Sequence, residues 1–437
     1  MHHRQTLIQI FVLAFLLCLA IGISSPLYAE AADSPITLIY TSNFQGEIEP
    51  CGCTMDGDFG GVPRRVTMLD RLREEDENLV LISSGGIFND IASTQNIINH
   101  AIVNGFKMIR FDAIGIQKKD FAPLAEHPLL AELNWVNSGA AKTPFHTDAT
   151  KTNAFYVKTI ERKQAKLHFY SLPKTEEFNP AVLQALQQSM QEKKSTGTII
   201  LSIESRSPYD KQIQPLLDEA LIQILIRPKR DEFYEEASLI NKTIVLQPGN
   251  RGMRLGKLVF DPQSPSKNFK HKIIPLGIDV PDSPRTTQWY EAYNQTVRAF
   301  FDKEAAVKAK DTSKTYVGAE TCKTCHLAVY DTWSKTLHAH AISKLENENK
   351  AFDPNCIGCH VAGYNEPGGY INQEKTPHLA NVQCESCHGA GYQHTQSPIM
   401  EKPTLHKLPS ADKCLQCHNK EHSPKFDFKT YWPRVAH

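Results

Sequence analysis

Four short segments near the carboxyl end of the chain repeat one set of reactive side chains: two cysteines three positions apart, followed directly by a histidine. They read CKTCH at 322–326, CIGCH at 356–360, CESCH at 384–388 and CLQCH at 414–418, and are called here the first to fourth motifs. At this spacing each cysteine sulfur can add to one vinyl group of a haem, and the adjacent histidine is carried beneath the ring to ligate the iron. The pattern therefore predicts four c-type haems.

Each motif then has two attachment points and one proximal iron ligand. The predicted attachment points are Cys322, Cys325, Cys356, Cys359, Cys384, Cys387, Cys414 and Cys417, and the predicted proximal ligands are His326, His360, His388 and His418. Other uses of paired cysteines fit less well. Zinc ribbons need no histidine after every pair, a thioredoxin-type redox pair usually occurs once, and a disulfide framework would not repeat the histidine.

The region that must hold these motifs contains few long apolar runs. We therefore expect a mainly α-helical, loop-rich domain in which the haems supply most of the core, and which is unfolded without haem. From Ser313 onward the chain has 13 basic and 12 acidic side chains, so the haem propionates would make this region negative. Its partners are expected to be redox proteins that present positive docking patches.

Longer stretches around the motifs resemble the tetrahaem cytochrome c-554 family. They are YVGAETCKTCHLAVYDTWSKTLHAHAI, CIGCHVAGYNEPGGY, NVQCESCHGAG and KFDFKTYWPRVAH, which together extend over nearly all of 315–437. The resemblance implies distal iron ligands at His338, His394 and His437, closely stacked haem pairs, and an open sixth position at the haem of the second motif. The part YDTWSKTLHAHA is expected to be helical.

His378, just before the third motif, departs from the family pattern. It either closes the haem of the second motif or is an exposed loop histidine. His340, His406 and His422 are weaker candidates for iron ligands. An iron with histidine on both faces suits electron transfer, whereas an open position allows ligand binding or chemistry.

Residues 33–285 have a different hydrophobic pattern, in which short apolar segments alternate with amphipathic ones. Predicted strands are ITLIY, NLVLISS, DAIGI and TIILSIES, and predicted helices are VPRRVTMLDRLREEDE and DIASTQNIINHAIVNGF. This alternation predicts an α/β layered domain.

The same region resembles the metallophosphatase domain of the 5'-nucleotidase family, in a series of ordered matches from PITLIYTSNFQGEIEP to IVLQPGNRGMRLGKLVFD. The resemblance implies a four-layer αββα sandwich with a two-metal site. The positions matched to metal ligands, however, read Asn43, Gln45, Gly86, Lys118, Lys119, Ile203 and the RPKRD segment at 227–231. Without carboxylate and imidazole ligands no metal-bound water can be activated, so phosphatase activity is not expected.

The loops around this former metal site have gained cations, namely Lys118, Lys119, Arg227, Lys229 and Arg230. They either bind an anion or are ordinary solvated loop residues. Cys51 and Cys53, in EPCGCTMDG, also follow the first strand. A disulfide across one residue is strained, so the alternatives are a redox-active pair, a metal or mixed-disulfide site, and plain buried thiols.

Residues 1–31 are predicted to be a secretory signal, with a retained membrane anchor as the alternative. No later segment is apolar enough to span a bilayer. An amphipathic helix and linker at 286–312 is expected to connect the domain at 33–285 to the haem domain at 313–437. Acidic and basic residues balance at 48 each with no basic stripe, so nucleic acid is not an indicated partner.

Export agrees with haem attachment, which in bacteria takes place outside the cytoplasm. The sequence thus predicts an exported, periplasmic electron-transfer protein whose phosphatase-like domain serves docking or ligand binding. One alternative is a haem-based oxidoreductase acting on a small nitrogen or sulfur compound at an open second haem. Another keeps the N-terminal domain as a working hydrolase with unusual ligands.

Overall fold

A computed structural model of the chain describes most residues from Pro35 to the end. The described ranges are 35–51, 58–88, 95–126, 133–139, 157–163, 165–174, 179–207, 209–228, 236–249, 251–308, 310–311, 313, 315–347, 350–403, 405, 410–419 and 422–437. The predicted signal at 1–31, Cys53, Lys229, Arg230 and His406 lie outside these ranges.

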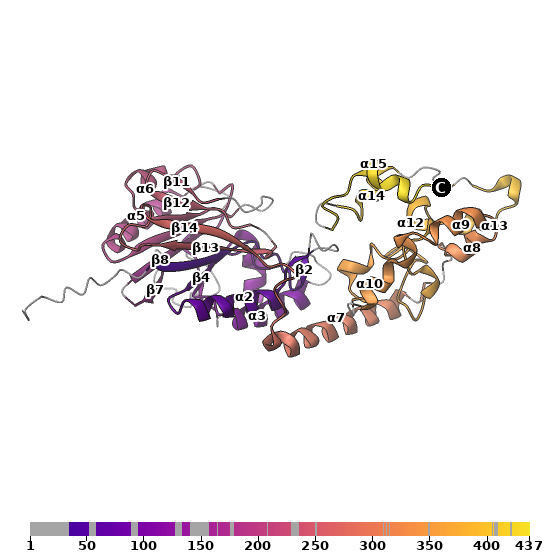
Figure 1. Ribbon diagram of the computed structural model, residues 1–437, viewed down its shortest axis with the longest axis horizontal. Coiled ribbons are helices and arrows are strands. Elements are labelled where there is room, and N and C mark those ends of the chain that lie inside the picture. Colours follow the sequence, from indigo (N-terminus) through magenta and orange to yellow (C-terminus); the bar gives the residue numbers. More distant parts are fainter. Residues whose placement is uncertain are drawn as a thin grey trace, which may run out of the picture.

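Two six-stranded sheets form the centre of the N-terminal region (Figure 1). The first has the order β14-β13-β1-β4-β5-β6, and its strands are Phe269–Pro275, Arg254–Phe260, Ile36–Thr41, Val80–Ser83, Ala113–Gly115 and Trp135–Val136. The second has the order β11-β12-β10-β9-β8-β7, with strands Ser238–Ile240, Thr243–Leu246, Ile224–Ile226, Thr198–Ile203, Ala165–Leu172 and Lys158–Arg162.

Strands β1 and β4 pair in parallel, with Leu38 opposite Val80, and β13 pairs with β1 in the antiparallel direction. Every residue of β1 is buried, as expected for a strand covered on both faces. A core of aliphatic and aromatic side chains from both sheets, including Leu38 and Phe169, fills the space between them.

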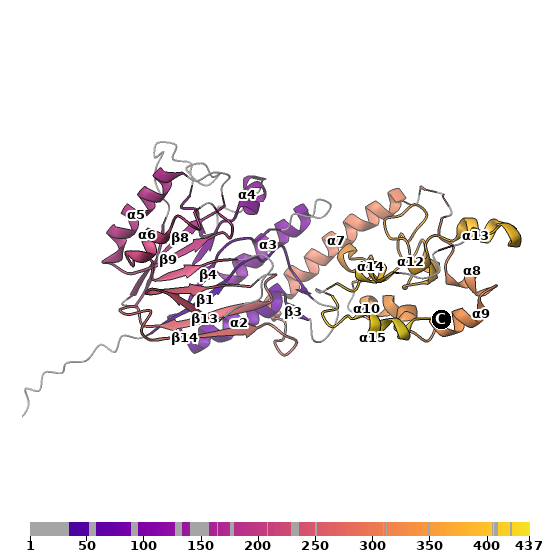
Figure 2. The same ribbon diagram turned by 90° about the horizontal axis from the view of Figure 1, so that it is seen from above.

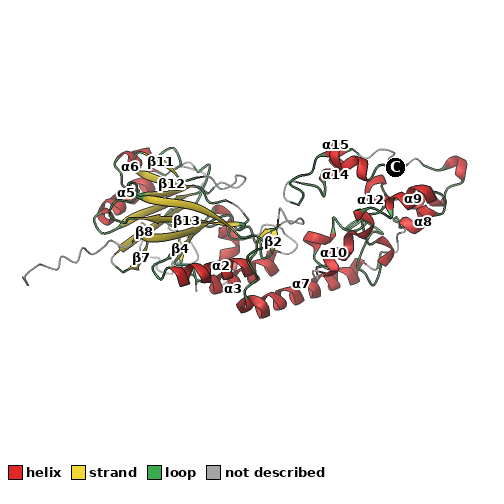
Figure 3. Cartoon of the chain, viewed as in Figure 1, coloured by secondary structure: helices red, strands yellow, loops and turns green. Residues whose placement is uncertain are grey.

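Helices cover the outer face of each sheet and complete four layers (Figure 3). On the first sheet these are α2 (Val62–Glu75), α3 (Gln95–Ile109) and the start of α7 (Thr287–Lys308), and on the second they are α5 (Pro180–Lys194) and α6 (Gln214–Asp218). Helix α2 shows why: Pro63 starts it, and Val62, Val66, Leu69 and Leu72 follow at helical spacing and are buried. The predicted αββα sandwich is confirmed.

Shorter elements occupy the edges of the sandwich. They are β2 (Pro50–Cys51), β3 (Phe59–Gly60), η1 (Lys118–Asp120), α4 (Phe121–Glu126) and η3 (Pro284–Thr286). Strands β2 and β3 pair with each other, on the side of the sandwich that faces the C-terminal region (Figures 1 and 2).

Helix α7 extends from the sandwich to the C-terminal region (Figure 2). Its first half packs on α3, where Tyr293 and Val297 are buried and Trp289 donates a hydrogen bond to the carbonyl of Ala101 at 3.0 Å. At its far end Lys308 lies over the ring of Tyr364.

The C-terminal region consists of short helices joined by loops, as predicted. Its helices are α8 (Ala319–Lys323), α9 (Leu327–Trp333), η4 (Leu337–His340), α10 (Ala341–Asn347), α11 (Pro354–Ile357), η5 (Pro377–Leu379), α12 (Cys384–His388), α13 (Tyr392–Gln396), η6 (Ile399–Glu401), α14 (Ala411–Leu415), α15 (Phe428–Tyr431) and η7 (Trp432–Arg434). Its buried apolar cluster is small and contains Ile342, Leu345, Ile357, Val361, Ala362, Tyr370, Leu379 and Ala380.

The helix expected across YDTWSKTLHAHA is interrupted, so this prediction was wrong in its continuity. Helix α9 ends at Trp333, and η4 begins only at Leu337. Thr336 between them is extended, and its hydroxyl donates to the carbonyl of Trp333 at 2.7 Å. Side-chain hydrogen bonding of this kind competes with the helical ladder and ends the helix.

None of the helices within the described ranges combines the length and the apolar character needed to cross a membrane.

Candidate functional site

Six histidines of the C-terminal region form three facing pairs, and each pair joins a motif histidine to a histidine from elsewhere. The ring centroids of His326 and His394 are 6.4 Å apart, those of His338 and His418 are 6.1 Å apart, and those of His388 and His437 are 5.8 Å apart. The first, fourth and third motifs are thus each brought to one of the histidines expected as distal ligands.

These separations match the space that one metal ion needs. Two imidazoles that bind a single metal through bonds of about 2 Å, with each ring centre behind its ligating nitrogen, have centres about 6 Å apart.

Hydrogen bonds fix which ring nitrogen is available. Nδ1 of His394 donates to the carbonyl of Pro403, Nδ1 of His437 donates to the carbonyl of Val435, and both distances are 2.9 Å. Because a carbonyl only accepts, Nδ1 carries the proton and Nε2 is left free as a metal ligand.

Burial keeps several of these rings uncharged. It lowers the pKa of His338, which the nearby ring of His418 lowers further, and it also lowers the pKa of His418. An imidazole must be unprotonated at the nitrogen that binds a metal, so burial favours the ligating form.

The second motif differs from the other three. Nδ1 of His360 donates to the carbonyl of Ala341 at 2.5 Å, and burial lowers the pKa of His360. Nε2 of His360 is therefore also available as a metal ligand. However, no imidazole of the described part of the chain makes a ring contact with His360.

His378, the candidate for closing this position, is exposed and lines a shallow pocket beside the first motif. Its neighbours in that pocket include Glu320, Tyr330, Trp333 and His340. In this arrangement His378 is not brought into contact with His360 among the described residues. His340 is exposed and hydrogen bonds to the carbonyl of Ser334, and His422 is half-buried.

The cysteine sulfurs show which motifs are neighbours. The side chains of Cys322 and Cys384 lie close enough to interact, which places the first motif beside the third. Those of Cys359 and Cys417 also lie close enough to interact, which places the second motif beside the fourth.

Cys387 of the third motif lies close enough to Cys414 of the fourth for the two sulfurs to interact electrostatically. The motifs therefore lie in the spatial order first, third, fourth, second.

Two buried polar side chains that the sequence reasoning missed hold the first and third motifs together. Glu385, inside the third motif, accepts backbone N–H groups of Val317 at 3.0 Å, Gly318 at 2.8 Å and Gly391 at 2.7 Å. Gln383 accepts from the backbone of Ala319 at 2.6 Å. The two residues between the cysteines of a motif can be of any type, so the sequence pattern does not mark Glu385. Its acidic side chain between two haem-attachment cysteines was the one signal that could have indicated this role.

The shape of the region fits c-type haem. Leu337 is 90% exposed, Leu327 is 56% exposed and Leu415 is 48% exposed, although each adjoins a motif or a paired histidine. A flat apolar ring held by the cysteines would cover such side chains, and the imidazole pairs provide axial ligands. Residues present in the structure therefore suit the group that the motifs predict.

In the N-terminal region the loops after β1 and β4, where the resemblance places metal ligands, are packed closely against each other. Asn43 and Gln45 have φ of 48° and 59°, and a Cβ at Gly86 would lie 2.7 Å from Oδ1 of Asn43. Asp120 is fully buried and accepts backbone N–H groups of this loop, including that of Gly86 at 2.7 Å. Burial raises the pKa of Asp120, while Lys119 and these hydrogen bonds act in the opposite direction.

Of the cations predicted around these loops, Lys118 is exposed and Arg227 forms an ion pair with Asp210 at 2.8 Å. Ile203 is buried in β9. Within the described residues, no group of three or more His, Cys, Asp or Glu side chains is arranged to hold a metal ion.

Cys51 lies in β2 rather than in an irregular loop, with its backbone paired to Phe59. Cys53, the other cysteine of the predicted redox pair, lies outside the described ranges.

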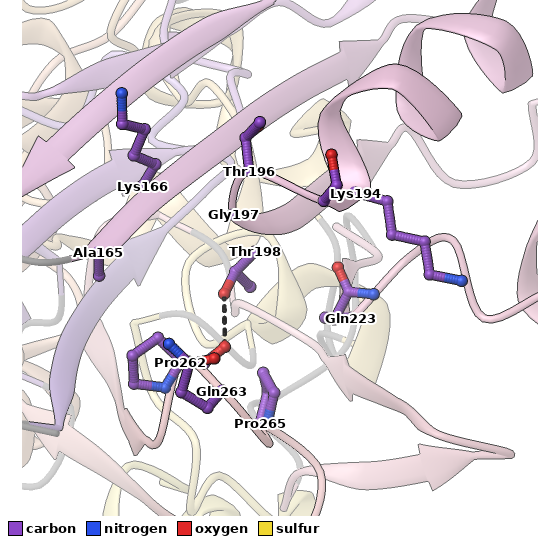
Figure 4. A pocket seen from close by; sticks show the side chains of 11 residues that line it. Ala165, Lys166, Lys194, Thr196, Gly197, Thr198, Gln223, Pro262, Gln263 and Pro265 are labelled. Carbon is purple, nitrogen blue, oxygen red and sulfur yellow. Dashed lines mark hydrogen bonds between the residues drawn. The ribbon is translucent and has the colours of Figure 1, made fainter.

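A surface pocket lies at the start of β9, where Thr198 donates a hydrogen bond to the carbonyl of Pro262 at 3.5 Å (Figure 4). This is the end of the strand opposite to the former metal site.

Comparison with known proteins agrees with both regions. Residues 321–389 match the family model described as cytochrome c554 and c-prime. Cytochrome c-554 of Nitrosomonas europaea is 35% identical over 85 residues, which is 16% of this chain and 36% of that protein. The chain therefore spans about a third of the length of this curated relative.

Solved structures resemble the N-terminal region. The sulfate thiohydrolase SoxB of Thermus thermophilus, solved with glycerol, has a TM-score of 0.50 and 10% identity, over 60% of this chain and 61% of that chain. A 5'-nucleotidase precursor, also from Thermus thermophilus, has a TM-score of 0.49 and 16% identity, over 79% of this chain and 73% of that chain.

Residues 321–389 of the C-terminal region are thus similar to the cytochrome c-554 family, and this region is joined to an N-terminal region whose fold resembles that of the metallophosphatases.

Proposed function

We propose that this chain is an exported multihaem c-type cytochrome that transfers electrons between redox partner proteins. Its similarity to cytochrome c-554 indicates c-type haem and electron transfer. The observation that carries the proposal is the set of three imidazole pairs, each with one motif histidine and a separation suited to one metal.

In this proposal the eight motif cysteines hold four haems, and the proximal ligands are the motif histidines His326, His360, His388 and His418. The distal ligands of the three pairs are His394, His338 and His437. When bound, c-type haem supplies an iron that gains or loses one electron. Burial keeps the ring of His338 neutral, and hydrogen bonds from Nδ1 orient the rings of His394, His437 and His360. Neighbouring cysteine sulfurs hold the motifs in their spatial order.

The spatial order first, third, fourth, second gives the path along which electrons can move through the region. The two ends of this series are the first and second motifs, which are therefore the proposed points of exchange with partners. With added propionate charge, this surface would attract partners with positive patches.

The N-terminal region is proposed to act in docking or ligand binding rather than in catalysis. Support comes from the amides Asn43 and Gln45 at positions where the resembling family has metal ligands, and from Gly86 at another. Amide oxygens without carboxylates or imidazoles are weak ligands for the ions that such enzymes use.

The test is the haem content and spin state of the purified mature protein. Mass spectrometry should show four covalently bound haems, and electron paramagnetic resonance should show three low-spin irons and one with an open position. Cell fractionation should place the protein in the periplasm. Unmodified thiols, or zinc in place of iron, would contradict the proposal.

A second candidate function is a haem-based oxidoreductase that acts on a small nitrogen or sulfur compound. It is favoured by His360, whose ring contacts no imidazole of the described residues. A high-spin signal that shifts when nitrite, hydroxylamine or sulfite is added, together with turnover of that compound, would support it. Four low-spin irons would exclude it and would point to His378 or an undescribed residue as a sixth ligand.

A further inference from the structure

A buried ion pair joins the two regions of the chain beside the second motif. Glu49, in the loop that leads to β2, forms an ion pair with Lys350 of the C-terminal region, and Lys350 also donates to Oδ1 of Asn294 on α7 at 2.6 Å. Lys350 is 6% exposed, and its Nζ lies 4.9 Å from the ring centroid of Tyr290 and 5.7 Å from that of Tyr293. Three segments that are far apart in the sequence thus meet at one ammonium group.

This cluster is linked directly to the attachment site of the second motif. The backbone N–H of Asp353 donates to the carbonyl of Lys350 at 2.9 Å, and that of Cys356 donates to the carbonyl of Asp353 at 3.0 Å. Asp353 is 3% exposed. Burial raises the pKa of Tyr293, and the negative charges of Asp353 and Glu49 and the nearby Cys356 sulfur raise it further, so this tyrosine is near both the ion pair and the motif.

Two carboxyl groups, those of Glu49 and the buried Asp353, lie close to the single ammonium group of Lys350. Burial raises the pKa of Glu49 to about 7; the Lys350 charge lowers it and the Asp353 charge raises it. A further negative charge nearby would raise the pKa of Glu49 again, because like charges disfavour the ionised carboxyl group.

Other ionisable groups around the cluster are accounted for by partners or lie at its edge. They are Glu47, paired with Arg251, Asp282 before α7, Tyr290 and Tyr293 on α7, and Arg298, whose guanidinium lies over the ring of Phe352. The tyrosines stay protonated at neutral pH because burial raises the pKa of each. The pKa of Glu49, at about 7, allows this carboxyl group to change charge near neutrality.

We propose that Glu49 takes up one proton from solvent as the haem of the second motif receives one electron, and releases it on reoxidation. This inference rests on the proposed function. The electron comes from a redox partner protein and the proton from water, so the total charge of the joint is the same before and after. An added negative charge in a poorly solvated site favours the neutral form of a nearby carboxyl group, and the two equilibria are coupled.

The test is the reduction potential of the second-motif haem as a function of pH in the full-length holoprotein. That haem is identified as the spectral component absent from a Cys356→Ser, Cys359→Ser variant. Its potential should fall as pH rises above about 7, where the oxidised form has lost the Glu49 proton and the reduced form retains it. The slope should approach about 59 mV per pH unit, the value for one proton per electron.

Glu49→Gln should abolish this slope, while Glu74→Gln, a matched change on the exposed side of α2, should leave it unchanged. The double variant Glu49→Gln, Lys350→Met removes both charges of the pair and should also give a flat profile if the single variant is unstable. Reduced-minus-oxidised infrared spectra should contain a protonated carboxyl band that the Glu49→Gln variant lacks.

A slope that persists in folded Glu49 variants would overturn the inference, as would a wild-type potential that is independent of pH. Absence of the second haem from the wild-type protein would contradict the proposed function instead, so the two failures are distinguishable.

Discussion

The histidines of the C-terminal region are prepared individually for metal binding before any cofactor is considered. In His394, His437 and His360 a backbone carbonyl fixes the proton on Nδ1, and in His338, His418 and His360 burial favours the neutral ring. Both effects arise from the surrounding chain and not from the motif itself. This is why spacing predicts the proximal histidines, whereas the distal ones came only from family resemblance.

Replacing His338 tests this distinction at one position. His338→Ala should leave His418 as the sole axial ligand of the fourth motif, so one low-spin signal should become high-spin. His340→Ala removes an exposed histidine two residues away and should change no signal. Electron paramagnetic resonance of the oxidised protein measures both. An unchanged spectrum in His338→Ala would show that this histidine does not ligate iron.

Glu385 provides a second test, which concerns the support of the motifs and not the iron. Glu385→Ala would leave the buried N–H groups of Val317, Gly318 and Gly391 without an acceptor, at a cost of about 3 kcal/mol or more in unfolding free energy. Thermal unfolding of the holoprotein, followed by haem absorbance, should show a clearly lower midpoint.

The exposed Glu401→Ala is the matched control for Glu385→Ala and should leave the midpoint within error. Equal midpoints for the two variants would mean that Glu385 does not tie the first motif to the third.

At the scale of elements, the N-terminal sandwich was the most predictable part of the molecule. The apolar runs that became β1, β4, β5 and β9 and the periodic segment that became α2 each carry their own signal. The break between α9 and η4 was not predicted, because Thr336 ends the helix through its side chain and its conformation. Likewise, the contacts among the motifs depend on sulfurs and on Glu385, which no periodic pattern reveals.

Helix α7 is the element that fixes the two regions to each other. Trp289→Ala would remove its hydrogen bond to Ala101 and its packing against Gly105, where the ring lies 3.0 Å from the position of a Cβ. We expect a loss on the order of 2 kcal/mol in the unfolding free energy, since the ring is only partly buried. Urea denaturation measures the loss, and Glu291→Ala on the exposed face of α7 should cause little change. A loss no larger than that of the control would show that Trp289 does not anchor α7.

At the scale of the whole molecule, the two regions gain their stability from different sources. Three extensive apolar clusters stabilise the N-terminal sandwich, whereas the described part of the C-terminal region has one small cluster. Sequence composition anticipated this contrast, because few apolar runs follow Ser313. It could not anticipate the joint at Lys350, where three distant segments meet.

In a variant with serine at all eight motif cysteines, the N-terminal sandwich should therefore stay folded while the C-terminal region unfolds. We expect the sandwich to keep its α/β circular dichroism and resist protease, while residues 315–437 are digested, because the haems that would fill that core are not attached. Limited proteolysis with mass spectrometry measures this. Protection of the C-terminal region in the absence of haem would show that it folds by its own packing.

The imidazole pairs also determine the order in which the proposed iron ligands can come together during maturation. If haem is attached outside the cytoplasm, as proposed, His326 can meet its partner only after residue 394 has been exported, His338 only after residue 418, and His388 only after residue 437. In the proposed holoprotein an early histidine could bind the iron of another motif until its partner arrives, because contacts between distant residues form slowly. Maturation should therefore pass through misligated species whose spectra change in that order.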